Sequence, residues 1–169
     1  EYCGGVFLDI TQAFDRVWWP GLLYKIKNNI PQYYVLLKSY LLDRKFEVKH
    51  RNAFSNIFPL NSGVPQGSIL GPLLYTIFTY DFPMDPDVLT ATFADDTAIL
   101  CSNHYPVIVS NTLNSALRLI AEWAGKWRVK INLSKTVHVV FTLRADFCPP
   151  VHLNYDLVPR ADFVRYLGI

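Results

Sequence analysis

Two adjacent aspartates interrupt an apolar run near the middle of the chain. Asp95 and Asp96 lie between the segments 88–94 and 97–100, and both segments have the composition of buried strands. Two carboxylates at a turn between buried strands repel each other and resist burial. A divalent cation relieves this cost, and Mg²⁺ is usually held by one or two carboxylates together with substrate phosphates. A plain acidic β-turn is the alternative interpretation, since Asp favours turns.

Composition limits the classes of protein that this chain can represent. It has 169 residues, 51% hydrophobic and 15% aromatic, which is enough for one folded domain with a sizeable core. Its net charge of +2 is too small to predict nucleic-acid binding without other signals. Pro, Gly or Asp interrupts every apolar stretch before the roughly 18 residues of a membrane span, so we expect no membrane partner.

The cysteines and the two ends of the chain add two expectations. The three cysteines are far apart and lack metal-ligand spacing, so we expect reduced thiols in an intracellular protein. The chain begins with Glu1 and ends within a strand-like segment at 166–169. We therefore expect an internal fragment of a longer protein.

Hydrophobic spacing predicts strands mixed with helices. Short apolar or alternating runs predict strands, and apolar residues at helical spacing predict helices, two of which begin at a proline. The expected strands are 5–10, 45–50, 56–60, 137–142, 151–155 and 163–166, together with both flanks of the acidic pair; the expected helices are 20–30, 31–41, 73–80 and 113–127. Because many strands are joined as hairpins, we expect an α+β fold with helices packed on one face of an antiparallel sheet.

A third carboxylate stands at the end of the first expected strand. Asp9 follows an apolar run, where a charge is costly unless something pairs with it. One interpretation is a cap for the helical turn near 11–14, since Asp caps helices well. The other is that Asp9 lies beside Asp95 and Asp96, where three carboxylates could hold two cations roughly 3.5–4 Å apart.

At this point five sequence blocks show a family resemblance. They occur in the order 8–17 (LDITQAFDRV), 62–72 (SGVPQGSILGP), 93–96 (FADD), 130–136 (KINLSKT) and 166–168 (YLG). Together they resemble the palm of reverse transcriptases of non-LTR, LINE-type retrotransposons, in particular the insect jockey-like group. The resemblance covers nearly all of the chain, and the second block is its most specific part.

The resemblance implies a role for individual residues of these blocks. Two Mg²⁺ ions, with Mn²⁺ as a substitute, would be held by Asp9, Asp95, Asp96 and the backbone of Ile10. Backbone amides of Ile10, Thr11, Gln12 and Ala13 would face the incoming triphosphate, and Gln66 and Gly67 would approach the nascent base pair. Phe14 would exclude a 2′-hydroxyl, Lys135 would reach the phosphates and protonate pyrophosphate, and Tyr166, Leu167 and Gly168 would begin the primer grip.

The implied reaction is attack of a primer 3′-oxygen on the α-phosphate of a dNTP, directed by an RNA template. The resemblance makes residues 1–169 a partial reverse transcriptase domain, the palm with part of the fingers, attached to other domains of a polyprotein. We expect this fragment alone to be nearly inactive, because most of the fingers and the thumb are missing. Nuclear action during target-primed synthesis follows from the same resemblance.

Three other interpretations compete with this one. A palm-like RNA-binding scaffold would be expected to lack one of the acidic ligands, but Asp9, Asp95 and Asp96 are all present. A nucleotide cyclase would lack the blocks 62–72 and 130–136, which this chain contains. A decayed copy of an element with intact local motifs stays open. Trp123 and Trp127 could stack on bases, but their spacing on one helix favours core packing.

Overall fold

The computed structural model describes residues 1–143 and 148–168, which form two compact units. We call Glu1–Thr11 with Asp81–Ile169 the sheet unit, and Gln12–Tyr80 the helical unit. Each is described by itself below. None of the helices in the described residues is long and apolar enough to cross a membrane.

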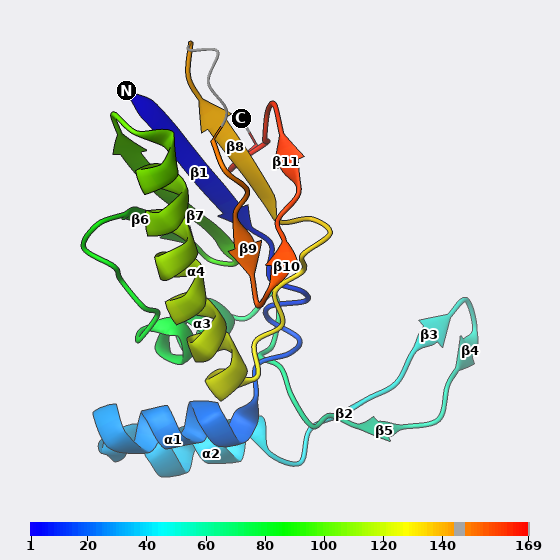
Figure 1. Cartoon of the computed structure of the whole chain (residues 1–169). Helices are drawn as coiled ribbons and strands as arrows, with labels where there is room; N and C mark the ends of the chain where they lie inside the picture. Colours follow the sequence, from blue (N-terminus) through cyan, green and yellow to red (C-terminus); the bar gives the residue numbers. More distant parts are fainter. Residues whose placement is uncertain (144–147, 169) are drawn as a thin grey trace. The chain divides into compact units, whose positions relative to one another are not determined.

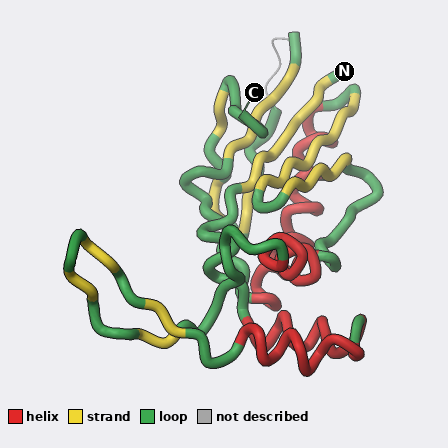
Figure 2. The backbone as a smooth tube through the Cα atoms, turned by 180° about the vertical axis from the view of Figure 1, so that it is seen from behind, coloured by secondary structure: helices red, strands yellow, loops and turns green. Residues whose placement is uncertain are grey.

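The sheet unit is built on five strands with one long helix against them (Figures 1 and 2). The strand order is β11-β8-β1-β7-β6, and only the pairing of β8 with β11 is parallel. The bounds are β1 Tyr2–Leu8, β6 Leu89–Phe93, β7 Asp96–Asn103, α4 Pro106–Trp127, β8 Val137–Phe141 and β11 Arg160–Ala161; a separate hairpin is formed by β9 His152–Leu153 and β10 Asp156–Leu157.

The core of the sheet unit lies between this sheet and α4. Alternate residues of β1, including Val6 and Leu8, are buried together with Ile99 of β7 and with the apolar stripe of α4 at Leu113 and Leu117. Trp123 and Trp127 are also buried, which confirms that they pack in the core. The apolar stripe of α4, which recurs every 3.6 residues, therefore covers one face of the sheet. The opposite face is not covered by α4.

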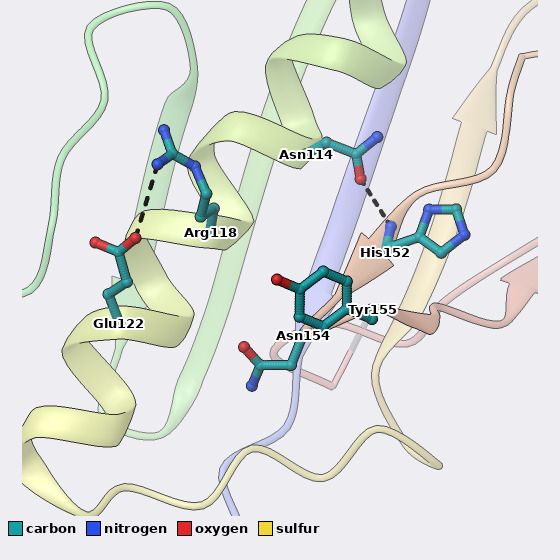
Figure 3. A pocket seen from close by; sticks show the side chains of 6 residues that line it. All are labelled: Asn114, Arg118, Glu122, His152, Asn154 and Tyr155. Carbon is teal, nitrogen blue, oxygen red and sulfur yellow. Dashed lines mark hydrogen bonds and ion pairs between the residues drawn. The ribbon is translucent and has the colours of Figure 1, made fainter.

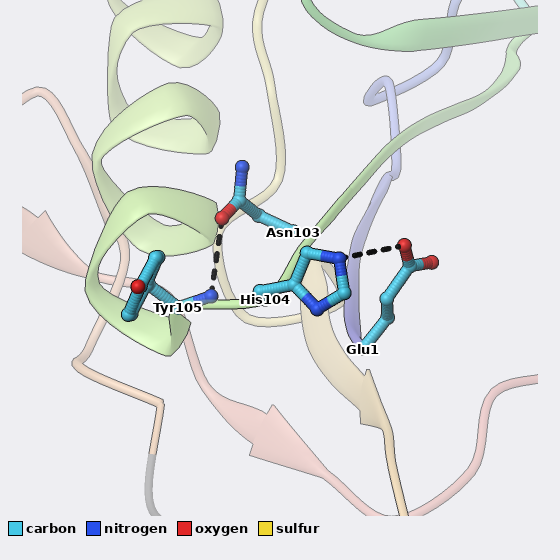
Figure 4. Close-up of polar contacts among 4 residues, drawn as sticks. All are labelled: Glu1, Asn103, His104 and Tyr105. Atoms are coloured by element: carbon cyan, nitrogen blue, oxygen red, sulfur yellow. Dashed lines mark hydrogen bonds and ion pairs between the residues drawn. The ribbon is translucent and has the colours of Figure 1, made fainter.

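A short polar turn joins β7 to α4 (Figure 4). Asn103 Oδ1 accepts a hydrogen bond from the Tyr105 N–H at 3.1 Å, and Pro106 occupies the first helical turn. His104 Nε2 lies 3.4 Å from Glu1 Oε1, with both side chains exposed. The exposed contact between His104 and Glu1 adds little to the stability of this turn.

The helical unit contains three α-helices and a two-stranded arm. Pro20 and Pro31 stand in the first turns of their helices, as the sequence predicts. Buried Lys25 donates to the Phe78 carbonyl, which places a cation at the C-terminal end of α3. The bounds are α1 Trp19–Asn29, η1 Pro31–Tyr33, α2 Tyr34–Leu41, β2 Lys45–Phe46, β3 Lys49–His50, β4 Ala53–Phe54, β5 Phe58–Pro59 and α3 Leu70–Thr79.

The expected α+β architecture is confirmed, while several local expectations are wrong. The run 45–50 forms two separate two-residue strands, and 163–166 forms no strand at all. Instead β11 pairs with β8 in a parallel register, which makes the sheet mixed. The strand β6 beside the acidic pair is largely exposed, although the sequence predicts a buried one. Alternation in the sequence marks extended chain but does not identify its pairing partner.

Candidate functional site

Two of the three expected carboxylates meet at one end of the sheet. β1 and β7 pair in antiparallel register down to Leu8 opposite Thr97, so Asp9 directly follows the last paired residue of β1 and Asp96 directly precedes Thr97. Side chains alternate between the faces of a strand, and Leu8 and Thr97 are the buried positions. Asp9 and Asp96 are therefore on the sheet face opposite α4.

Asp95 is held close to them by a tight hairpin. Phe93 pairs with Asp96, which leaves Ala94 and Asp95 as the two turn residues between β6 and β7. Ala94 adopts a φ of +53°, a left-handed conformation that is common in two-residue hairpin turns but unfavourable for a residue with a side chain. Asp95 and Asp96 are exposed and Asp9 is half-buried. The hairpin thus presents both carboxylates to solvent beside Asp9.

The fourth block is hydrogen-bonded to the segment that follows β1. The Asn132 N–H donates to the Asp9 carbonyl at 2.8 Å, and the Asp9 N–H donates to Thr136 Oγ1 at 3.3 Å. The Thr11 N–H donates to the Lys130 carbonyl at 2.9 Å, so this amide already has a partner within the chain. Lys135 is exposed within the turn 132–136. The first and fourth blocks therefore form one local structure.

The fifth block lies against the open face of the same sheet. The ring of Tyr166 makes an edge contact with Phe7, with centroids 5.6 Å apart, and its hydroxyl lies 3.4 Å from the Ala91 carbonyl on β6. Burial, and then the charge of Asp96, raises the pKa of the Tyr166 phenol. Leu167 and Gly168 follow with positive φ angles of 52° and 83°. The side chain of Tyr166 is thus electrostatically coupled to the acidic hairpin.

The second block is bound to the later part of the first block within the helical unit. The Val64 N–H donates to the Phe14 carbonyl at 2.8 Å, and the Gln66 amide donates to Asp15 Oδ1 at 2.8 Å. A Cβ on Gly63 would lie 2.8 Å from the Asp15 carbonyl oxygen, and φ there is +90°, so only glycine fits.

The other expected site residues of the helical unit are Phe14, Gly67, Gln12 and Ala13. Phe14 is half-buried and stacks on Tyr75 with ring centroids 4.7 Å apart. Gly67 has φ +78°, and a Cβ there would meet no atom within 4 Å, so it is constrained by backbone conformation rather than by space. Gln12 and Ala13 belong to the preceding turn, and Gln12 Oε1 accepts from Arg16 Nε at 2.9 Å.

The donor set at the sheet end fits a hard cation, but its side chains are not gathered around one. Asp9, Asp95 and Asp96 offer only oxygen ligands, which Mg²⁺ prefers. Their positions are adjacent in the register and the hairpin, and two of the three are solvent-exposed. Among the described residues, no three Asp, Glu, His or Cys side chains are grouped as they would be around a metal ion.

A separate cavity of about 560 Å³ lies on the sheet unit between α4 and the β9–β10 hairpin (Figure 3). Arg118 and Glu122 form an ion pair 3.7 Å apart, and Asn114 Oδ1 accepts from the His152 N–H at 2.8 Å. None of its lining residues belongs to the five sequence blocks, and its charged pair is already satisfied. The end of the sheet therefore remains the candidate active site.

Sequence reasoning missed the residues that support the expected site residues. Asp15 binds Gln66, and Thr136 and Asn132 bind the backbone of Asp9. The sequence did contain a signal that Asp15 could matter, since Asp15 is the second acidic residue of the first block. Thr136 and Asn132 had none beyond their place in the fourth block, because hydrogen bonds between distant segments leave no local pattern.

Comparison with known proteins identifies the class. The family model described as reverse transcriptase (RNA-dependent DNA polymerase) matches residues 1–169. The RNA-directed DNA polymerase from the mobile element jockey of Drosophila melanogaster is 45% identical over 178 residues, covering 100% of this chain and 19% of that protein. The probable RNA-directed DNA polymerase from transposon BS of the same species is 43% identical, covering 100% of this chain and 20% of that protein.

A solved structure supports the fold independently. Apo telomerase from Candida tropicalis, truncated from its C-terminal domain, superposes with a TM-score of 0.63 at 16% identity, covering 86% of this chain and 32% of that one. The chain belongs to the reverse transcriptase family, and the resemblance to jockey-like polymerases is confirmed. It matches the family model over its whole length, and it spans about a fifth of the length of its curated relatives.

Proposed function

We propose that this domain catalyses two-metal transfer of a nucleotide from a dNTP to a primer 3′-hydroxyl on an RNA template. The observation that carries the proposal is that Asp9 and Asp96 directly adjoin the last pair of the β1–β7 ladder, Leu8 with Thr97, while Asp95 lies in the turn before β7. These three carboxylates would hold two Mg²⁺ ions, together with the backbone of Ile10, and Mn²⁺ would substitute. When bound, the ions would supply charge stabilisation for the attacking and leaving oxygens.

The remaining residues of the site would position the substrate rather than react with it. Amides of Ile10, Gln12 and Ala13 would face the triphosphate; the Thr11 amide is the exception, since it already donates to Lys130. Exposed Lys135 would reach the same phosphates and donate a proton to the leaving pyrophosphate.

Residues of the helical unit would contact the sugar of the incoming nucleotide and the nascent base pair. Phe14, whose ring stacks on Tyr75, would lie under the sugar and exclude a 2′-hydroxyl. Gln66 and Gly67 would let backbone approach the base pair, and the hydrogen bond from Gln66 to Asp15 supports this by fixing the Gln66 amide. Tyr166, Leu167 and Gly168 would begin the primer grip.

We further propose the context in which the domain works. Residues 1–169 would be the palm with part of the fingers of a longer polyprotein, acting on an RNA template and a DNA primer. The reaction would take place in the nucleus during target-primed synthesis. The chain by itself would extend a primer poorly or not at all, since it spans about a fifth of the length of its relatives.

A graft provides the direct test. The matching segment of the Drosophila melanogaster jockey polymerase is replaced by this chain, and primer extension is measured on an RNA template with dNTPs and Mg²⁺. We expect extension by the graft, and a loss of at least roughly a hundredfold in Asp95→Asn, because a ligand of the charge-stabilising ions is removed. Asp87→Asn, at an exposed aspartate just before β6, is the matched control and should retain activity.

The outcomes separate the interpretations. Full activity of Asp95→Asn would remove the acidic cluster from the mechanism. A folded but inactive wild-type graft, beside an active jockey polymerase, would mean that this copy is a catalytically dead module. In Phe14→Val we expect increased ribonucleotide incorporation, and Tyr75→Leu serves as the control for losing the ring stack alone. The isolated 169-residue chain is assayed in parallel to test its expected inactivity.

A further inference from the structure

The helical unit carries a β-ribbon whose residues are almost all exposed. We call residues 44–59 the arm; β2 pairs with β5 and β3 with β4, and the chain reverses at Arg51, where φ is +54°. Ser55 bonds Val48 twice, at 2.9 Å each, where one strand carries an extra residue and forms a bulge. Every residue from 45 to 59 is exposed.

Large apolar side chains cover this exposed ribbon. Their exposed fractions lie between 43% and 65%, which is unusual for a group of neighbours in a folded domain. The residues are Phe46, Val48, Phe54, Ile57 and Phe58. An isolated two-stranded hairpin is at best marginally stable in water, so a partner that covers these side chains would stabilise the arm.

Charge indicates which kind of partner fits. The arm contains four cationic side chains, Arg44, Lys45, Lys49 and Arg51, and one carboxylate, Glu47, which gives a net charge of +3. The whole chain carries +2, so the remaining residues together carry −1. The positive charge of the chain is thus concentrated in the arm. A second copy of the arm would be repelled, whereas a polyanion would be attracted.

The cations and aromatic rings of the arm are interleaved. Lys49 and Phe54 are opposite each other in the register, and the Lys49 ammonium lies 5.3 Å from the centre of the Phe54 ring. Phe46 and Phe58 are also opposite each other, with ring centroids 5.8 Å apart. Ammonium groups attract phosphates, and exposed aromatic rings can stack on unpaired bases.

A cavity of about 370 Å³ lies at the base of the arm, within the same unit. Arg44 and Lys45 line it together with the apolar side chains of Trp19 and Leu23. Asp43 also lines the cavity, so a phosphate would be expected on the side of the two cations. The cavity thus combines apolar and cationic side chains, as the arm does, and lies between the arm and the helix α1.

We propose that the arm binds single-stranded nucleic acid, with its lysines and arginines on the phosphates and Phe46, Phe54 and Phe58 against the bases. This binding surface goes beyond the proposed polymerase function and requires neither a metal ion nor a dNTP. Its failure and the failure of the active-site assignment can therefore be told apart.

Fluorescence anisotropy of the 169-residue chain with short labelled RNA and DNA strands, in EDTA, tests the proposal. We expect Phe46→Ala and Phe54→Ala each to weaken binding about tenfold, because a stacked base is lost. Lys45→Gln, Lys49→Gln and Arg51→Gln together should lower the slope of log affinity against log salt concentration by about 2. Asp87→Asn, outside both the arm and the proposed active site, should bind as the wild type does.

Exposed residues of α1, η1 and α2 provide the matched controls. Lys27→Gln with Lys38→Gln removes two exposed cations that lie 6.0 and 5.9 Å from an aromatic ring, and Tyr33→Ala removes an exposed ring. Equal losses in these controls would overturn the proposal, because binding would then be general. Unchanged binding in the phenylalanine variants, or competition by polyphosphate as strong as by RNA, would also overturn it.

The remaining outcomes concern the identity of the partner. Tighter binding of RNA than of DNA would assign the arm to the template, and the reverse order would assign it to a DNA strand. Equal binding of a blunt duplex would contradict a site built on unpaired bases. If the arm variants changed only the oligomeric state of the chain, the apolar surface would belong to a protein interface and the proposal would be wrong.

Discussion

At the scale of single residues, the acidic hairpin depends on a conformation that its sequence does not favour. Ala94 holds φ at +53°, although an alanine in this region is strained. The strain is accepted at the turn that carries Asp95, between Phe93 and Asp96, which pair with each other. A short side chain at position 94 is therefore part of how the two carboxylates are presented.

Substitution at position 94 should test this strain. We expect Ala94→Val to destabilise the hairpin by roughly 1–3 kcal/mol, since a β-branched side chain is unfavourable at positive φ. Ala94→Gly should be neutral or stabilising. Urea unfolding of the 169-residue chain provides the measurement. Thr92→Val, at an exposed strand position of the same hairpin, is the control, and an equal loss there would contradict the explanation.

At the scale of elements, the end of β1 is fixed by the turn before β8. Thr136 is fully buried, and its hydroxyl accepts from the Asp9 N–H, while Asn132 donates to the Asp9 carbonyl. Both backbone polar groups of Asp9 are thus bonded within the fourth block. The carboxylate is positioned by its backbone, and the side chain keeps the freedom that ligation of a cation would need.

Removing the Thr136 hydroxyl should loosen this connection. We expect Thr136→Val to lower the free energy of unfolding by about 1–3 kcal/mol, because the Asp9 N–H loses its acceptor in a partly buried site. Thr136→Ser keeps the hydroxyl and should lose less. Equal stability of the valine variant and the wild type in urea unfolding would show that the 3.3 Å hydrogen bond contributes nothing.

At the scale of the whole molecule, the sheet unit contains a buried group that couples its stability to pH. His138 on β8 is 2% exposed, and its Nε2 has no hydrogen-bond partner among the described residues. Burial, together with the charge of Arg160, lowers the pKa of His138 from 6.5 to about 4. The imidazole is therefore buried in its neutral form on β8, next to β1, the central strand of the sheet.

This pKa shift predicts a loss of stability in mild acid. The unfolded chain binds a proton near pH 6.5, but the folded chain does so only near pH 4, so stability present above pH 6.5 falls as the pH is lowered toward 4. The full loss amounts to roughly 3 kcal/mol. Urea unfolding between these pH values should show a smaller dependence in His138→Leu. His152→Gln, at an exposed histidine, should behave as the wild type, and parallel curves for His138→Leu and the wild type would exclude the effect.

The sequence by itself determined the elements whose signals are local. Prolines mark the starts of α1 and η1, the stripe of α4 marks its buried face, and an acidic pair between two strand-like runs marks the hairpin. These patterns are sufficient because helix periodicity, proline geometry and turn preferences act between residues that are near each other in the chain. The five blocks in order likewise determined the family.

Only the tertiary structure decided how distant segments meet. It brought Asp9 and Asp96 to the same end of the β1–β7 ladder, bound the fourth block to the backbone of Asp9, and paired Arg160 of β11 in parallel with His138 of β8. It also left the arm uncovered, although its alternation resembles that of a half-buried strand. Alternation of apolar and polar residues indicates an extended strand. Its register and its pairing partner depend on packing between segments that are far apart in the sequence, and no local pattern encodes that packing.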